Sequence, residues 1–163
     1  SGESEKQHRK RNQVQSTIGK RSGDERQHSA IIMRRVAREN LFKLVFEYTF
    51  YGTANDQTLE LMLQGSDLTE DDRNFLNGCY FGIVTREDEL KKIIEEHLEG
   101  YRIERVYRPD YAVLLLATYE LLEHTAPNAV IINEAVDLSK KYGTDKSGSF
   151  VNGVLAKIVK DIK

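Results

Sequence analysis

The sequence predicts an all-α fold, and three observations support that prediction. Apolar residues recur at spacings of three and four along most of the chain, which is one face of a helix with 3.6 residues per turn. Alternating polar and apolar runs, the mark of half-buried strands, are missing. Glycine, proline and polar clusters interrupt the helical pattern, so about seven helices joined by short loops are expected.

The length and composition favour one folded domain. A chain of 163 residues with 39% hydrophobic and 31% charged residues is long enough to bury a core. The longest apolar run, Ala112–Ala117, is far shorter than the roughly 20 residues of a membrane span. No signal peptide opens the chain, so a cytoplasmic location is expected. Cys79 is the single cysteine, which leaves no internal disulfide and favours a buried core residue.

Charge is distributed unevenly along the chain. Residues 1–40 hold ten Lys and Arg against five Asp and Glu, whereas the remaining residues hold 14 against 21. We predict a disordered basic tail over residues 1–29, whose opening Ser1–Gly2 is typical of a purification-tag remnant, and one folded domain over residues 30–163. A basic front on an acidic body indicates contact with a polyanion, although charge runs are also typical of solvated surface.

The first strong helix is predicted over Ala30–Tyr51 from its regularly spaced apolar residues. Its N-terminal part carries three arginines, at the end where the helix dipole already provides partial positive charge. Arginines placed against the dipole, beside exposed backbone N–H groups, favour a phosphate site, and a solvated helix start is the alternative. The three residues are Arg34, Arg35 and Arg38.

Four helices are expected in the middle of the chain. The second of them begins with Thr69 and three acids, Glu70–Asp72, which we interpret as a helix cap, with a metal site as the alternative. The fourth, with Pro109 in its first turn, is apolar on nearly every side and is predicted to be the central buried helix. The four helices cover residues 56–63, 69–84, 85–98 and 109–122.

The last two helices are predicted over Asn128–Tyr142 and 147–162, with Ser147 as the cap of the second. Gly143 is expected to end the first of them in a left-handed conformation. Gly153 lies inside the second, where glycine costs about 1 kcal/mol against alanine, so close helix approach is expected there.

Two amides, Asn133 and Asn152, lie on or beside the apolar faces of these helices. A buried amide needs hydrogen-bond partners. We favour a structural pair that fixes the register of the two helices over direct contact with a ligand.

Phe150 stands near the start of the last helix, after a slightly basic loop that contains Lys146. Single-stranded RNA is commonly held by stacking on such aromatics, with cations along its phosphates. The helical period taken alone favours Phe150 as a core residue, and RNA stacking stays open as the other interpretation.

Enzyme chemistry finds little support in the sequence. The four histidines have no spacing that would assemble a metal site or pair a nucleophile with its base. Gly143 and Gly148 fall between helices rather than after a strand, so they do not form a phosphate loop. Glu120 and Glu134 are candidates for an acid and a base, but they lie on different helices. We therefore predict no catalysis, no metal and no cofactor.

Four strings of the sequence form a recognisable set: I-N-E-A-V-D-L-S-K-K-Y-G and F-V-N-G-V-L near the C-terminus, with R-R-V-A-R-E-N-L-F and F-L-N-G upstream. Together they resemble the NusB family of bacterial transcription antitermination factors. The resemblance covers about Met33–Lys163. It implies an all-helical protein of two helical subdomains that is not an enzyme.

The resemblance also implies partners. Proteins of the family bind the boxA segment of ribosomal RNA operon leader transcripts together with NusE, a small-subunit ribosomal protein, and the complex keeps RNA polymerase from terminating early. Some of them form homodimers that cover the RNA face. A stand-alone helical scaffold that binds proteins and no specific RNA is the alternative.

The family's binding positions can be placed on this sequence. Phe46 and Asp110 match positions that face NusE, the second of them at the shared RNA surface. Lys146 occupies a loop position that is often acidic in relatives. The positions expected to contact RNA are Arg34, Arg35, Arg38, Lys146 and Phe150.

Overall fold

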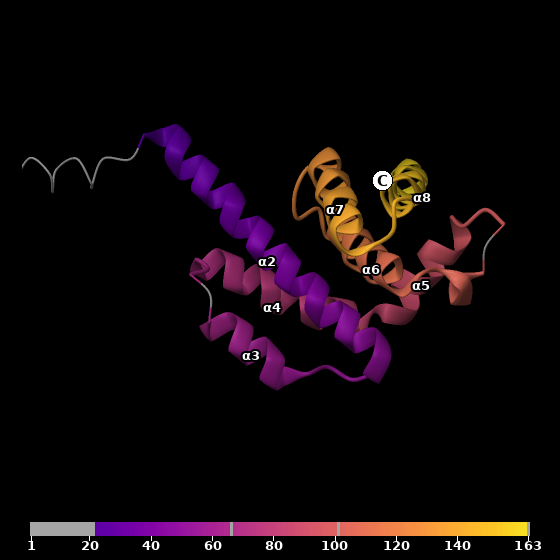
Figure 1. Cartoon of the computed structure of the whole chain (residues 1–163), viewed down its shortest axis with the longest axis horizontal. Coiled ribbons are helices and arrows are strands. Elements are labelled where there is room, and N and C mark those ends of the chain that lie inside the picture. The colour runs from indigo at the N-terminus through magenta and orange to yellow at the C-terminus, as the bar shows by residue number, and fades with distance from the viewer. Residues whose placement is uncertain (1–21, 66, 101, 163) are drawn as a thin grey trace, which may run out of the picture. The chain divides into compact units, whose positions relative to one another are not determined.

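The protein is all-α, as predicted. The computed structural model describes residues 22–65, 67–100 and 102–162, in which seven α-helices and one short 3-10 helix are found and no strand (Figure 1). The chain divides into two compact units, Ser1–Met33 and Arg34–Lys163. The elements are α2 (Gly23–Tyr51), α3 (Asp56–Gln64), α4 (Glu70–Thr85), α5 (Glu87–Glu96), η1 (Ile103–Arg105), α6 (Arg108–Glu123), α7 (Asn128–Tyr142) and α8 (Ser147–Asp161).

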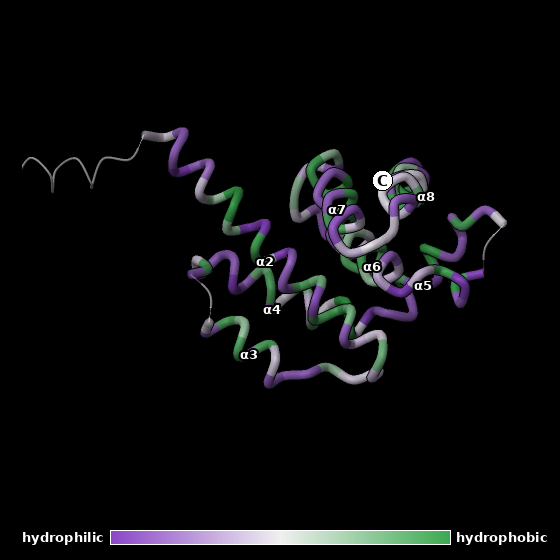
Figure 2. The backbone as a smooth tube through the Cα atoms, in the orientation of Figure 1, coloured by the Kyte–Doolittle hydropathy of each residue, from purple (hydrophilic) through white to green (hydrophobic). Residues whose placement is uncertain are grey.

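Helix α6 is the centre of the larger unit, which confirms the prediction from its apolar sequence. Ten of its residues are buried, and it packs against α4, α5, α7 and α8. Figure 2 shows hydrophobic and hydrophilic residues alternating along α2, α7 and α8. Cys79 is a buried core residue, also as predicted. Among the described helices none combines the length and the apolarity that a membrane crossing demands.

Helix α2 begins earlier than predicted. Its first residue is Gly23, not Ala30, and Asp24 and Glu25 occupy the first turn. The sequence pattern missed this extension because residues 23–32 are almost all exposed and show no buried stripe. Residues 1–21 of the predicted tail lie outside the described residues. The predicted phosphate site at a helix end is therefore wrong, since the free N–H groups belong to the first turn, about three turns before Arg34.

Helix ends were predicted with mixed success. Thr69 caps α4, since its side-chain oxygen accepts a hydrogen bond from the Asp72 amide at 3.2 Å. Ser147 does not cap α8: its hydroxyl is buried and accepts the Thr144 amide at 2.8 Å. Gly143 ends α7 in an extended conformation with φ of −98°, so the left-handed prediction is wrong. It must be small because an added Cβ would collide with Ser147.

The close approach predicted at Gly153 is also wrong. An added Cβ there would meet nothing within 4 Å, whereas one at Gly148 would lie 3.2 Å from Cγ of Lys140. Asn133 and Asn152 are exposed, on the solvent side of α7 and α8, so they form no buried pair. Each of these three residues lies off the buried stripe of its helix, which is why the expected contacts are not made.

Candidate nucleic-acid interface

Arg38 is a buried structural residue. Its side chain is 5% exposed and faces Glu120 of α6, which is 1% exposed. The guanidinium donates from Nε to both carboxylate oxygens at 3.1 Å and from Nη2 at 2.9 Å. Thr125 donates a further hydrogen bond to Glu120 at 2.7 Å. This pair neutralises both charges inside the domain and ties α2 to α6.

Arg34 ties α2 to α4. Its Nε donates to Oδ1 of Asp72 at 2.7 Å, and its guanidinium lies 4.3 Å from the ring centroid of Phe75. The Asp72 side chain is nearly buried. The acidic cluster at the start of α4 thus has a cap and an arginine partner, and the part of the chain that the structure describes contains no group of residues suited to a metal.

Arg35 is the exposed arginine of the three, with 57% of its side chain accessible. Its Nε donates to Glu134 of α7 at 3.0 Å. Lys141 of α7 is exposed beside it and pairs with Glu39 of α2 at 2.6 Å. The hydrogen bond from Lys141, with a second from Tyr142, holds the pKa of Glu39 below its usual range. Arg35 and Lys141 line one hollow of about 140 Å³ between α2 and α7.

Three predicted site residues meet where α6 and α8 begin, one in the first turn of α6 and two at the start of α8. Asp110, Lys146 and Phe150 line a cavity of about 200 Å³. We call it the α6–α8 cavity, and it is lined by Arg105, Val106, Tyr107, Asp110, Thr144, Lys146, Ser147 and Phe150. Lys146 and Tyr107 are exposed, and Phe150 is half-buried and packs against the core. Phe150 thus packs against the core and also lines the α6–α8 cavity.

Asp110 is the buried acid of this cavity. It is 5% exposed, and burial raises the pKa of its carboxyl, an effect that a hydrogen bond with Ser147 partly opposes. Its Oδ1 atom has no hydrogen-bond partner among the described residues. A buried carboxylate oxygen without a donor is costly to the fold, and this atom is almost wholly inaccessible from the surface.

Phe46 belongs to an aromatic ridge along the C-terminal half of α2. It stacks on Phe42 with centroids 5.8 Å apart and meets the edge of Phe50 at 5.0 Å. Phe50 is 57% exposed, and Arg108 of α6 lies over its ring at 4.3 Å. The sequence analysis missed Phe50 and Arg108. Phe50 could have been found from the sequence, because it is a large aromatic residue that lies outside the buried stripe of its helix.

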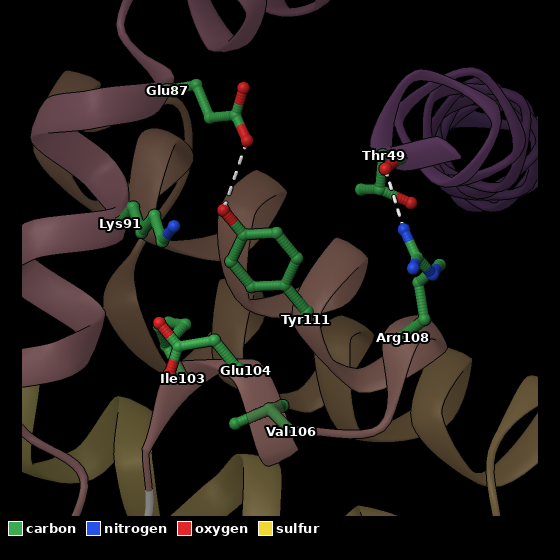
Figure 3. Close-up of a pocket in the computed structure, with 8 residues that line it drawn as sticks. All are labelled: Thr49, Glu87, Lys91, Ile103, Glu104, Val106, Arg108 and Tyr111. Carbon is green, nitrogen blue, oxygen red and sulfur yellow. Dashed lines mark hydrogen bonds between the residues drawn. The ribbon is translucent and has the colours of Figure 1, made fainter. Parts of the chain in front are cut away.

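A second hollow, of about 250 Å³, lies beside this ridge (Figure 3). Two pairs of its lining residues bind each other: Tyr111 donates to Glu87 at 3.2 Å, and Arg108 donates to the Thr49 carbonyl at 2.7 Å. Tyr48 also donates to Glu87, and burial together with this carboxylate raises the pKa of Tyr48 to about 12. These contacts hold α2, α5 and α6 together, so we assign the hollow to the fold.

Glu120 and Glu134, considered as an acid and base, do not act together. Each accepts hydrogen bonds from a different arginine of α2, Glu120 from buried Arg38 and Glu134 from exposed Arg35. The arrangement of the surface is suited to binding: exposed cations, accessible aromatic rings and one buried acceptor.

Comparison with known proteins gives one consistent result. The NusB family model matches residues 35–160. The transcription antitermination protein NusB of Ruminiclostridium cellulolyticum is 37% identical over 128 residues, which cover 78% of this chain and 88% of that protein. The protein of the same name from Fusobacterium nucleatum is 39% identical over 137 residues, covering 79% and 90% of the two chains.

Solved structures agree with the sequence comparison. T. maritima NusB matches with a TM-score of 0.72 at 35% identity, covering 78% of this chain and 91% of that one. A structure of the antitermination factors NusB and NusE in complex with dsRNA contains a chain that matches with a TM-score of 0.70 at 26% identity, covering 80% and 98%.

Proposed function

The chain belongs to the NusB family, and from that premise we propose that it is an RNA-binding transcription antitermination factor. It binds the boxA segment of ribosomal RNA operon leader transcripts together with NusE, and it promotes processive transcription of those operons as part of an RNA polymerase complex. The role is one of binding, without catalysis or a cofactor, and it is exercised in the cytoplasm. A homodimer that covers the RNA face would be a form of the protein that does not bind RNA.

The α6–α8 cavity is the observation that carries this proposal. It gathers an aromatic ring, an exposed lysine and a buried acid, Phe150, Lys146 and Asp110, of which the acid lies 36 or more positions before the other two. Stacking on an aromatic, with a cation near the phosphate, is the usual way to hold single-stranded RNA. The solved complex of NusB, NusE and dsRNA supports RNA and NusE as the partners.

In this proposal the arginines of α2 have different roles, some in RNA binding and some in stabilising the fold. Arg35 contacts phosphate, because it is exposed and, among the described residues, only its Nε is engaged, by Glu134. Arg34 has less freedom, since Asp72 and Phe75 hold it. Arg38 is assigned to the fold, because its guanidinium is buried against Glu120. Arg38 matches an RNA-binding position of the family motif, but its side chain is not accessible to RNA in this structure.

The aromatic ridge of α2 is the proposed NusE face. Phe46 is half-buried within it, and Phe50 and Arg108 extend it toward solvent. Exposed aromatics beside an arginine are typical of the centre of a protein interface.

The test is binding of a labelled boxA RNA and of a scrambled RNA, with and without NusE, to the wild type and to Arg35→Ala and Phe150→Ala. We expect NusE to tighten binding to boxA over the scramble. Loss of the Phe150 stack should weaken RNA binding by about 1–3 kcal/mol. Loss of Arg35 should lower the salt dependence of binding, since one phosphate contact disappears.

Lys157→Ala is the matched control for loss of one cation. Lys157 pairs with Glu99 at 3.0 Å and lies outside both binding surfaces, so its loss should leave RNA affinity within about twofold. Equal affinity for both RNAs, indifferent to NusE and to the two substitutions, would instead support the protein-binding scaffold.

A further inference from the structure

We propose that His97 and Asp161 form a proton-dependent latch, which holds the last turn of α8 against the end of α5 while the imidazole carries both of its ring protons. We call this pair the α5–α8 latch. The two residues lie 64 positions apart in the sequence. His97 directly follows the last residue of α5, and Asp161 is the last residue of α8. The latch makes the docking of this helix end sensitive to pH, and the inference does not depend on the proposed function.

Both ring nitrogens of His97 face hydrogen-bond acceptors. Nε2 lies 2.5 Å from Oδ2 of Asp161, and Nδ1 lies 2.7 Å from the carbonyl oxygen of Ile93. An ionised carboxylate and a backbone carbonyl can only accept, so each contact requires a proton on the ring nitrogen. A neutral imidazole has a single N–H and can serve only one of the two acceptors. The doubly protonated imidazolium satisfies both at once, and the α5–α8 latch therefore depends on a proton.

The two helix ends favour a charged pair at this place. The His97 amide donates to the Ile94 carbonyl at 3.0 Å, while the ring of the same residue serves the Ile93 carbonyl. A cation is favoured at this end of α5, because the C-terminal end of a helix carries partial negative charge. Asp161 is an anion at the C-terminal end of α8, which the dipole of that helix disfavours. The imidazolium of His97 offsets this cost.

The surroundings of His97 favour its charged form. Its side chain is 10% exposed, and the charged groups that act most strongly on the ring are two acids, Asp161 of α8 and Glu96 of α5. Burial lowers the pKa of His97, but the hydrogen bonds to the Ile93 carbonyl and to Asp161 outweigh burial, so the pKa is raised above 6.5. The α5–α8 latch is therefore fully formed below pH 6.5 and is lost as the pH rises through the raised folded value.

The part of α8 that the latch controls is its last turn. Lys157, one turn before Asp161, pairs with Glu99 at 3.0 Å and joins the same two parts of the chain. Ile158 is fully buried and anchors the helix at this level. The amide of Ile162 donates to the Ile158 carbonyl at 3.1 Å and closes the turn. Loss of the latch is thus expected to loosen the turn after Ile158 and to leave the rest of α8 in place.

The first measurement is an NMR titration of the His97 ring in the full chain, from about pH 5 to about pH 8.5. We expect the pKa of His97 to lie above 6.5 and to fall in Asp161→Asn, which removes the anion and keeps the size of the side chain. The signal of the Ile162 amide should shift with the same midpoint, because the last turn of α8 responds to the proton. A His97 pKa that is unchanged in Asp161→Asn would overturn the inference.

A double-mutant cycle measures the strength of the latch. Wild type, His97→Gln, Asp161→Asn and the double variant are unfolded in urea at about pH 5.5 and at about pH 8.5. We expect the two residues to be coupled about threefold in the unfolding equilibrium constant at the lower pH, since Asp161 is 70% exposed and solvent weakens the pair. The coupling should fall below about 1.5-fold at the higher pH. Equal coupling at both pH values would overturn the inference, because the contact would not depend on the proton.

Glu99→Gln is the matched control, because it removes the neighbouring bridge to Lys157 at the same junction. Carboxylates and lysines ordinarily keep their charges across this pH range. The variant should therefore change stability alike at both pH values and leave the coupling of His97 to Asp161 as in the wild type. If the His97 pKa fell as far in Glu99→Gln as in Asp161→Asn, the effect would come from the general charge of this region, and the latch would be ruled out.

Discussion

Arg35 and Arg38 lie three positions apart in one arginine-rich string, yet the structure gives them opposite environments. Arg38 is 5% exposed and bound to a buried glutamate, whereas Arg35 is 57% exposed and donates a hydrogen bond to Glu134. The difference teaches that a run of like residues on a helix can serve folding on one face and binding on the other. Burial, rather than residue type, separates the two roles.

The physical basis of the comparison is desolvation. A charge taken out of water must be fully paired, and breaking such a pair leaves an uncompensated charge inside the protein. An exposed charge keeps most of its hydration and gains little from its partner. Its free donors remain available to a phosphate.

The largest effect is expected for Arg38→Ala. It would leave Glu120 buried without its arginine, and we expect a loss of about 3–5 kcal/mol in the free energy of unfolding, measured by urea denaturation. The double variant Arg38→Met with Glu120→Leu is the control, since it removes both charges and keeps apolar volume. If Arg38→Ala lowered the free energy of unfolding no more than a surface variant does, the contrast between Arg38 and Arg35 would be wrong.

Arg34→Ala should have an intermediate effect. Asp72 would keep its bond from the Thr69 hydroxyl at 2.9 Å but lose the arginine. We expect a loss of about 1–3 kcal/mol in unfolding free energy, because one nearly buried carboxylate is left under-satisfied. Arg73→Ala, at an exposed position of the same helix α4, should change stability by less than about 0.5 kcal/mol.

Glu134→Gln tests the proposed role of Arg35 in RNA binding. It should leave stability within about 1 kcal/mol, since its partner Arg35 is mostly exposed. It should raise RNA affinity by up to about fivefold, because a competing carboxylate no longer holds the guanidinium. Fluorescence anisotropy with labelled boxA RNA measures this change, and a fall in affinity would show that Glu134 positions Arg35 for RNA instead.

The smallest effect is the pH dependence that Glu39 contributes. Its pKa is lowered in the folded protein, first by Lys141 and then by Tyr142. The carboxylate therefore stabilises the fold above its unfolded pKa of 4.5, and this contribution disappears as the pH falls through the lowered folded value. The difference in Tm between wild type and Glu39→Gln should be present at neutral pH and vanish in acid. If the difference in Tm persisted in acid, it would arise from packing rather than from the charge of Glu39.

Much of the fold could be predicted from the sequence because it depends on local pattern. The apolar period of α6 predicts its burial, and Thr69 with its following acids predicts the start of α4. The start of α2 could not be found in this way, since its first turns bury nothing. Close packing at Gly148, rather than Gly153, depends on where Lys140 of another helix lies.

The residues of the candidate site could be named from the sequence, and their surroundings in the fold could not. The family resemblance pointed to Asp110, Lys146 and Phe150, and the structure brings them to one cavity. The inward turn of Arg38 depends on Glu120, which lies 82 positions further along the chain, so no local pattern indicates it. The unpartnered Oδ1 of Asp110 likewise depends on packing around it.

The most direct test of the division between folding and binding arginines is the salt dependence of boxA RNA affinity. It should be measured for the wild type, Arg35→Ala and the double variant Arg38→Met with Glu120→Leu. We predict that Arg35→Ala lowers the slope of log affinity against log salt by about one, and that the double variant keeps the wild-type slope. A slope lowered equally by both, in proteins shown to be folded, would contradict the account.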